Sequence, residues 1–137
     1  MDRVAVLDCG NDERGSSPVE FVLVGALLTV LTLGVLQFAL AVYVRNVVHE
    51  AAVEGAHVAA LADTEAGEGV RRTELVIGRA IGADYARDVR VRETRALGAP
   101  TVEVTVHTTL PLIGLLGVPS GLEVTGRAPV ESFTEEG

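Results

Sequence analysis

The sequence contains few aromatic residues, a single cysteine and no lysine. Tryptophan is absent, and three phenylalanines and two tyrosines are the only aromatic side chains. A core must therefore be built from valine, leucine, isoleucine and alanine. Cys9 is the only cysteine, so an intramolecular disulfide is excluded. Because lysine is absent, arginine supplies all of the side chains that are positively charged at neutral pH, with histidine counted as neutral.

Positive charge is also scarce. The formal net charge is −8, and the chain beyond residue 44 carries 14 acidic residues against nine arginines. A nucleic-acid partner requires a basic stripe that neutralises phosphates, and docking on anionic lipid requires basic clusters. We therefore expect no nucleic-acid partner and no peripheral attachment to anionic lipid.

Patterns that carry catalysis or bind metal are missing as well. His49-Glu50 begins like the HExxH motif of zinc proteases, but Val53 stands where the second histidine is needed. Glu103 and His107 share one face of a predicted strand, which we interpret as a solvated face rather than an acid–base pair. We expect no enzyme, no metal site and no cofactor.

What the chain does contain is one long uncharged apolar run. The 24 residues from Phe21 to Val44 carry no charge, and about 20 suffice to cross a bilayer as a helix. The run is too long for an ordinary secretory signal and is not followed by a small-residue cleavage site, so it should stay attached. Arg3 and Arg14 precede it and Arg45 follows it, which weakly favours a cytoplasmic N-terminus.

Helix signals surround this run. Ser17 suits an N-cap, Pro18 suits the first helical position, and Glu20 completes a capping-box pattern with Ser17. No helix breaker follows before Gly55, which is itself flanked by alanines. One helix is predicted from Pro18 to about Ala62, with a first half suited to lipid and a second half that forms a stalk.

The middle of the chain predicts a second helix. Residues 63–69 are polar and glycine-rich, as in a hinge. From Val70 to Tyr85 apolar residues recur at close to helical spacing, which indicates an amphipathic helix.

The last third changes to the alternation of β-strands. Strands are predicted near residues 89–92, 102–107 and 122–128. Residues 98–100 read as a turn. Leu110 to Pro119 is apolar but broken by proline and glycine, and we expect a loop that packs on the sheet or rests at the membrane surface.

The expected fold class is α+β. A long N-terminal transmembrane helix continues into a stalk, and a second amphipathic helix and a small three-stranded antiparallel sheet follow. The organisation expected along the chain is a leader over residues 1–15, the transmembrane and stalk helix over 16–62, and a small extracytoplasmic domain over 63–137.

Glu20 has two interpretations. A carboxylate beside a membrane helix is costly and usually has a partner. As part of a capping box, it satisfies a backbone donor at the helix start. If the chain is cut after Gly15, the new α-amino group of Ser16 could instead pair with Glu20 of a neighbouring copy and fix the register between helices. The two interpretations are compatible.

These residues resemble a known signal. Gly15, Ser16 and Glu20 before a long apolar helix are similar to the class III, type IV-like prepilin signal, with Gly at −1 and Glu at +5. The closer resemblance is to the TadE-like family of tight-adherence, Flp-type pilus systems. Its typical start has the form Arg-Gly-x-x-x-Val-Glu-Phe, here Arg14-Gly15-Ser16-Ser17-Pro18-Val19-Glu20-Phe21.

The resemblance continues beyond the apolar run. An Ala-rich, Glu-Gly-Ala-Arg-like segment corresponds to residues 54–60, with His57 in place of the usual arginine. A late strand, a Leu-Pro step, a broken apolar loop and a last strand correspond to residues 102–130. The leader differs from the usual basic form because it carries four acids and two arginines, and Pro18 lies very near the cut.

The resemblance implies a pseudopilin or minor pilin that assists assembly of a Flp-type pilus or an associated secretion apparatus. It implies cleavage between Gly15 and Ser16 by a prepilin peptidase, and Glu20 as the assembly residue. Implied partners are that peptidase, other pilin-like subunits, membrane components of the assembly machine and the lipid bilayer. The N-terminus would be cytoplasmic, and the C-terminal domain would be extracytoplasmic or in a pilus.

Two alternatives stay open on the sequence. An uncut single-pass membrane protein could scaffold a secretion machine, which the acidic leader and the capping box favour. A membrane-tethered enzyme or ligand-binding domain is the other, although no residue pattern supports such a site.

Overall fold

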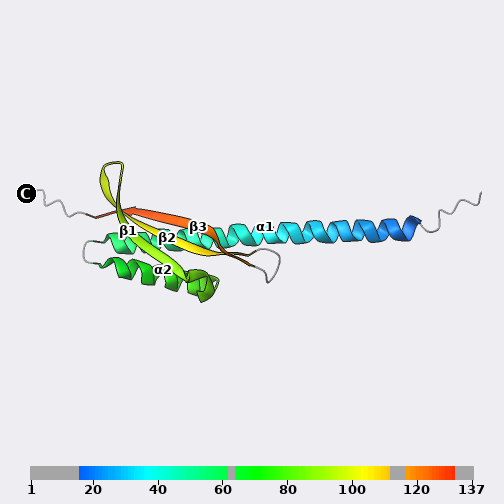
Figure 1. The fold of residues 1–137 in the computed structure, drawn as a ribbon, viewed down its shortest axis with the longest axis horizontal. Coiled ribbons are helices and arrows are strands. Elements are labelled where there is room, and N and C mark those ends of the chain that lie inside the picture. The colour runs from blue at the N-terminus through cyan, green and yellow to red at the C-terminus, as the bar shows by residue number, and fades with distance from the viewer. Residues whose placement is uncertain (1–15, 62–63, 112–116, 132–137) are drawn as a thin grey trace, which may run out of the picture. The chain divides into compact units, whose positions relative to one another are not determined.

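The computed structural model describes residues 16–61, 64–111 and 117–131. In chain order these form a long helix, a second helix, a short 3₁₀ helix and three strands (Figure 1). The chain divides into two compact units, Met1–Leu36 and Gln37–Gly137. This confirms the α+β class, with a long apolar N-terminal helix, a second helix and three strands.

Helix α1 runs from Ser16 to Ala60, 45 residues. It begins one residue before the expected cap, so Ser17 lies inside its first turn and the N-cap prediction for Ser17 is wrong. Pro18 is tolerated there because the N–H groups of a first turn have no partner within the helix. In the first unit, every described residue of α1 is exposed.

In the second unit, α1 changes character and supplies one wall of a core. Its buried residues recur every three or four positions, which places them on one face of the helix. They are Val44, Val48, Ala51, Ala52, Gly55, Ala56 and Ala60. The domain limits expected from the sequence stay predictions. The structure adds that residues 37–60 contribute to the same core as the sheet.

Helix α2 spans Ala66–Ala80, and the 3₁₀ helix η1 spans Ala83–Ala86. The second helix is thus confirmed, but it ends five residues before the expected Tyr85. It stops because the N–H groups of Ile81 and Gly82 both turn back to the carbonyl of Ile77, with Gly82 at φ +111°. Glycine suits this position because a positive φ is costly for residues with a side chain.

The sheet contains β1 (Asp88–Ala96), β2 (Ala99–Pro111) and β3 (Gly117–Pro129) in the order β1-β2-β3, with both neighbouring pairs antiparallel. Side chains alternate between its two faces. The inner face closes the core with valine, leucine and alanine. Its buried members on β2 and β3 are Val102, Val104, Val106, Leu122, Val124 and Ala128.

Two sequence expectations about connections are wrong. Leu110 to Pro119 is not simply a loop, because Leu110 pairs with Val118 and Pro111 with Gly117 in the β2–β3 ladder. Pro111 fits at the last position of its strand, where a missing N–H costs no central ladder bond. Residues 112–116 lie outside the described part of the chain.

The turn expected at residues 98–100 lies one residue earlier. Ala96 pairs with Ala99, so Leu97 and Gly98 alone form the β1–β2 connection. Both have positive φ, +52° and +82°, which is the backbone of a type I′ hairpin turn. That turn matches the right-handed twist of the flanking strands, and Pro100 can then take its place in β2.

The sheet lies directly on the backbone of α1. A Cβ atom added at Gly126 of β3 would lie 2.4 Å from the carbonyl carbon of Ala52 and 2.4 Å from the backbone nitrogen of Val53. Only glycine allows this approach. Gly126 is therefore required for the packing of β3 against the helix.

We predict that Gly126→Ala lowers the free energy of unfolding of the full-length chain in detergent by about 1–3 kcal/mol, the usual cost of overpacking. Gly67→Ala is the matched control, because a Cβ there meets nothing within 4 Å. In a helix this change should be neutral or stabilising by up to about 1 kcal/mol. Equal effects of the two changes in denaturant unfolding would contradict the close packing.

Candidate functional site

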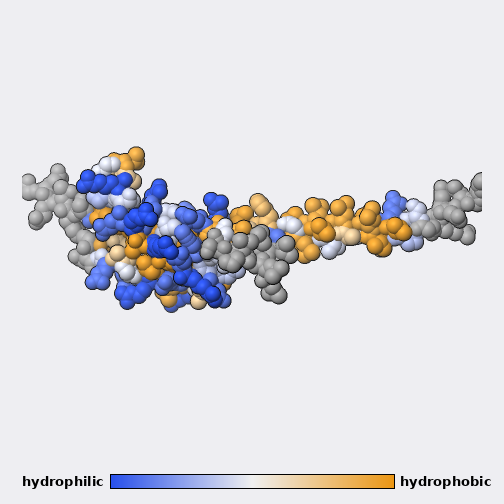
Figure 2. Space-filling model, viewed as in Figure 1, coloured by the Kyte–Doolittle hydropathy of each residue, from blue (hydrophilic) through white to orange (hydrophobic). Residues whose placement is uncertain are grey.

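The first part of α1 is apolar around its whole circumference. Its best 18-residue window has a mean hydropathy of 2.4 and none of it is buried. Figure 2 shows this stretch as an almost continuous hydrophobic surface. By length and composition the helix can cross a membrane, as the sequence predicted.

The two ends of the uncharged run lie in different surroundings. Phe21 is 80% exposed, whereas Val44 is 1% exposed and belongs to the core. Next to Val44, the side chains of Phe38 and Tyr43 remain exposed. The second unit, Gln37–Gly137, thus begins inside the apolar run, and we call it the compact unit below. Between residues 37 and 44 one face of the helix begins to contact the core, while apolar side chains on its other faces stay exposed.

Glu20 lies on the exposed apolar part of α1, four residues after the helix begins. Val19 and Phe21 beside it are both exposed hydrophobic residues. Within the described ranges, the ion pairs do not include Glu20. Ser16 is the first residue of the helix, and Gly15 lies outside the described residues. Their roles in cleavage and assembly stay predictions.

Helices α1 and α2 meet at two glycines. A Cβ added at Gly55 would lie 1.8 Å from Oγ1 of Thr73 and 2.7 Å from the carbonyl oxygen of Gly69. One added at Gly69 would lie 2.5 Å from the carbonyl oxygen of Gly55 and 2.6 Å from Cβ of Ala59. The two backbones therefore touch, and neither glycine can be replaced without moving a helix.

Two polar contacts hold the same crossing. The buried hydroxyl of Thr73 lies 2.9 Å from the carbonyl oxygen of Gly69 and 3.3 Å from that of Ala51, to either of which it can donate. Arg72 donates from Nε to Oε1 of Glu54 at 2.8 Å.

These contacts give the Glu-Gly-Ala segment at residues 54–56 a structural role that sequence reasoning missed. Glu54 pairs with Arg72 of α2, Gly55 lets the backbone of α2 pack directly on α1, and Ala56 is fully buried. The sequence did carry a signal for this helix contact, namely the many alanines and the glycine of residues 51–60. We interpreted these small residues only as favouring a helix.

The two members of the polar pair on the predicted strand, Glu103 and His107, have different partners. Glu103 accepts a hydrogen bond from Nε of Arg127 at 2.7 Å. His107 lies between two other carboxylates, with Nδ1 3.9 Å from Asp88 and Nε2 3.8 Å from Glu123. The outer face of the sheet therefore carries cross-strand pairs of acidic and basic side chains. The side chains of Glu103 and His107 are only 16% and 26% exposed there, so this part of the face is less solvated than the sequence predicted.

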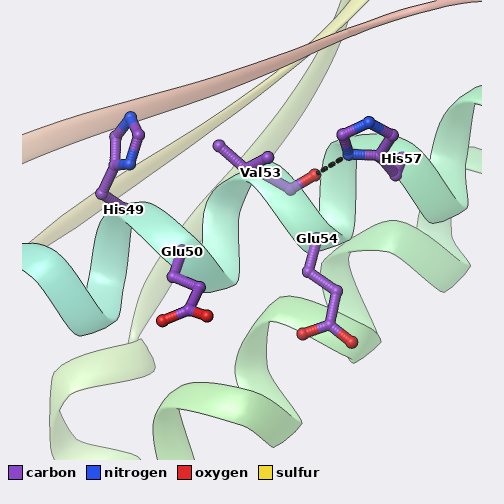
Figure 3. A pocket seen from close by; sticks show the side chains of 5 residues that line it. All are labelled: His49, Glu50, Val53, Glu54 and His57. Atoms are coloured by element: carbon purple, nitrogen blue, oxygen red, sulfur yellow. Dashed lines mark hydrogen bonds between the residues drawn. The ribbon is translucent and has the colours of Figure 1, made fainter.

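A shallow hollow lies on the exposed side of α1 (Figure 3). Val53 lies at its centre, Glu50 and Glu54 point to one side, and His49 and His57 lie on the other. The ring of His57 lies with Nδ1 2.9 Å from the carbonyl oxygen of Val53. The hollow is thus an apolar spot beside two carboxylates.

Comparison with known proteins gives one family. The model of the family described as TadE-like protein matches residues 15–57, which confirms the resemblance for that segment. The match includes Gly15, Glu20 and Gly55, and therefore both the predicted cleavage position and the glycine at the helix crossing. Neither the curated proteins nor the solved structures give a significant match.

We predict that Thr73→Val destabilises the full-length chain in detergent by about 1 kcal/mol, because it removes a buried hydroxyl donor and leaves a carbonyl without it. Thr105→Val makes the same change on the outer sheet face, where the hydroxyl is only partly buried. Its contact there is long and therefore weak, since Oγ1 of Thr105 lies 3.4 Å from Oγ1 of Thr125. That control should shift unfolding by no more than about 0.5 kcal/mol. A larger loss from Thr105→Val than from Thr73→Val would contradict the role of Thr73.

Proposed function

We propose that this chain, whose residues 15–57 are TadE-like, is a pseudopilin or minor pilin that assists assembly of a Flp-type pilus or its associated secretion apparatus. The observation that carries the proposal is the start of α1. The helix begins at Ser16, and Glu20 is its only charged residue before Arg45. The family match begins at the residue before the helix.

In this proposal a prepilin peptidase cuts between Gly15 and Ser16. The new α-amino group then falls on the first residue of α1, where the positive end of the helix dipole disfavours a cation. Glu20 lies four residues later, on the same helical face. Its carboxylate can therefore neutralise the amino group of its own chain or that of a neighbouring copy.

Pairing with a neighbour would set the register of assembly. In the low dielectric of a bilayer or filament core, a lone carboxylate or a lone amine is strongly penalised, whereas the pair is tolerated. A neighbouring helix is held most favourably where its amine reaches Glu20. The same penalty gives the assembly machine a means of rejecting misaligned subunits.

The remaining features suit a membrane subunit. Residues 16–36 expose an apolar surface to lipid, the N-terminus faces the cytoplasm, and the compact unit is extracytoplasmic. The role is structural rather than enzymatic. The partners are the peptidase, other pilin-like subunits and membrane components of the assembly machine.

A second candidate is an uncut single-pass scaffold of a secretion machine. The leader favours it, because its four acids and two arginines differ from the basic leader that a prepilin peptidase usually meets. Pro18 near the cut favours it as well. In this candidate Glu20 has no pairing role.

We predict that Glu20→Gln lowers incorporation into the sheared pilus or high-mass assembly fraction by at least about tenfold, because it removes one partner of a desolvated ion pair. Cleavage should continue, as measured by intact mass. Glu74→Gln is the control, since Glu74 is an exposed carboxylate on α2, and it should incorporate normally. Normal incorporation of the Glu20 variant would refute the pairing.

We also predict that Gly15→Leu blocks the cut and leaves full-length protein in the membrane, without loss of the folded unit, because residue 15 precedes α1. Pilus or secretion output should fall with it. Unchanged output from uncut protein would instead favour the scaffold candidate.

A further inference from the structure

The β1–β2 hairpin ends in an uncharged apolar tip. Leu97 is 108% exposed, the largest value among the large hydrophobic residues of the described chain, and its neighbours in the turn are alanine and glycine. Figure 1 shows this hairpin projecting away from the helices. A leucine in this position buries no side-chain surface against the described part of its own chain.

The backbone at Leu97 is also unfavourable for leucine. Its φ of +52° lies in the left-handed region, which costs an ordinary side chain free energy that glycine or asparagine largely avoids. The first position of a type I′ turn strongly prefers asparagine. Strained residues of this kind are often kept for a function, so an exposed leucine here points to a contact outside the chain.

Lipid is not the partner of this tip. The strand ends near the tip are tied to the end of α1, because Val130 donates to the carbonyl of Pro100 and Glu131 donates to that of Ala60. Ala60 is 16 residues beyond Val44, about 24 Å along the helix. A tip at that level lies well beyond the end of the apolar run, so its partner is a protein.

The hollow on α1 has the matching chemistry. Val53 offers an apolar centre for Leu97, and Glu50 is an exposed carboxylate at the border. Arg95 is exposed two residues before Leu97 and supplies the opposite charge. Glu54 is already paired with Arg72, whereas the ion pairs among the described residues do not include Glu50.

We propose that Leu97 of one copy docks on Val53 in the hollow of a second copy, with Arg95 beside Glu50. Val53 lies seven residues before Ala60, so tip and hollow are offset by about 10 Å along α1. Two copies at equal height cannot make this contact. The interface is therefore head-to-tail between staggered copies, the type of interface that builds an open filament rather than a closed ring. The inference rests on the proposed function only in placing this interface within a pilus-like assembly.

The contact can be tested by disulfide cross-linking of full-length chains in detergent, where the bilayer does not hold the copies at one height. Cys9→Ser removes the native thiol. Copies with Leu97→Cys are mixed with copies carrying Val53→Cys, and a disulfide forms only if the two Cα atoms approach to within about 7 Å. The control mixture pairs Leu97→Cys with Leu75→Cys, an exposed leucine on α2.

We expect at least about tenfold more cross-linked dimer with Val53→Cys than with Leu75→Cys. Arg95→Glu should remove this excess, and adding Glu50→Arg to the Val53→Cys partner should restore it. No cross-link to Val53→Cys, or equal cross-linking to both partners, would overturn the proposal. Because detergent cross-linking needs neither cleavage nor a pilus, its failure would leave the proposed function untouched.

A second variant separates docking from folding. Leu97→Asn places the favoured residue in the turn, so the thermal midpoint should stay equal or rise. Copies that carry it should nevertheless associate with one another at least about tenfold more weakly than unsubstituted copies do, measured by sedimentation of labelled protein at low concentration. Unchanged association would contradict the docking of Leu97.

Discussion

The compact unit depends on direct contact between the backbone of α1 and the elements packed on it. Ala52 meets Gly126 of β3, and Gly55 meets Gly69 and Thr73 of α2. A core built largely from valine and alanine buries little area per residue, so its stability requires many close atomic contacts rather than a few large side chains. Glycine at each crossing makes those contacts possible, and the buried Thr73 hydroxyl and the Arg72–Glu54 pair then fix how α2 lies on the helix.

This arrangement lets one helix serve two environments. From Ser16 to Leu36 the side chains of α1 are exposed, and from Phe21 onward they are uncharged and mostly apolar, as a lipid-facing segment requires. From Val44 to Ala60 its buried face consists of small and β-branched residues, as close packing requires. A mixed stretch joins the two, in which Val44 is buried while Phe38 and Tyr43 face outward. Because the TadE-like match covers residues 15–57, it includes both kinds of surface as well as Glu20.

Local patterns predicted much of this fold. The apolar run, the second helix and the alternating strands each have a period that points to one structure, and all were found. Contacts that join distant segments were not predictable in this way. Pairing of Leu110 with Val118 depends on the partner strand, so a stretch rich in proline and glycine was interpreted as a loop. The Leu97–Gly98 turn was missed because leucine is a poor residue for its backbone. The packing role of Gly55 depends on Gly69 and Thr73, which no local spacing reveals. Glu20 and Ser16 were identified from the spacing of a signal, and their roles are chemical predictions that geometry alone does not test.

The central claim is that the mature chain begins at the first residue of α1. The most direct test is the intact mass of the protein recovered from membranes of cells with an active prepilin peptidase. The account predicts a species that begins at Ser16 and lacks Cys9. A full-length species that still carries Cys9 would contradict it and would identify the chain as an uncut membrane scaffold.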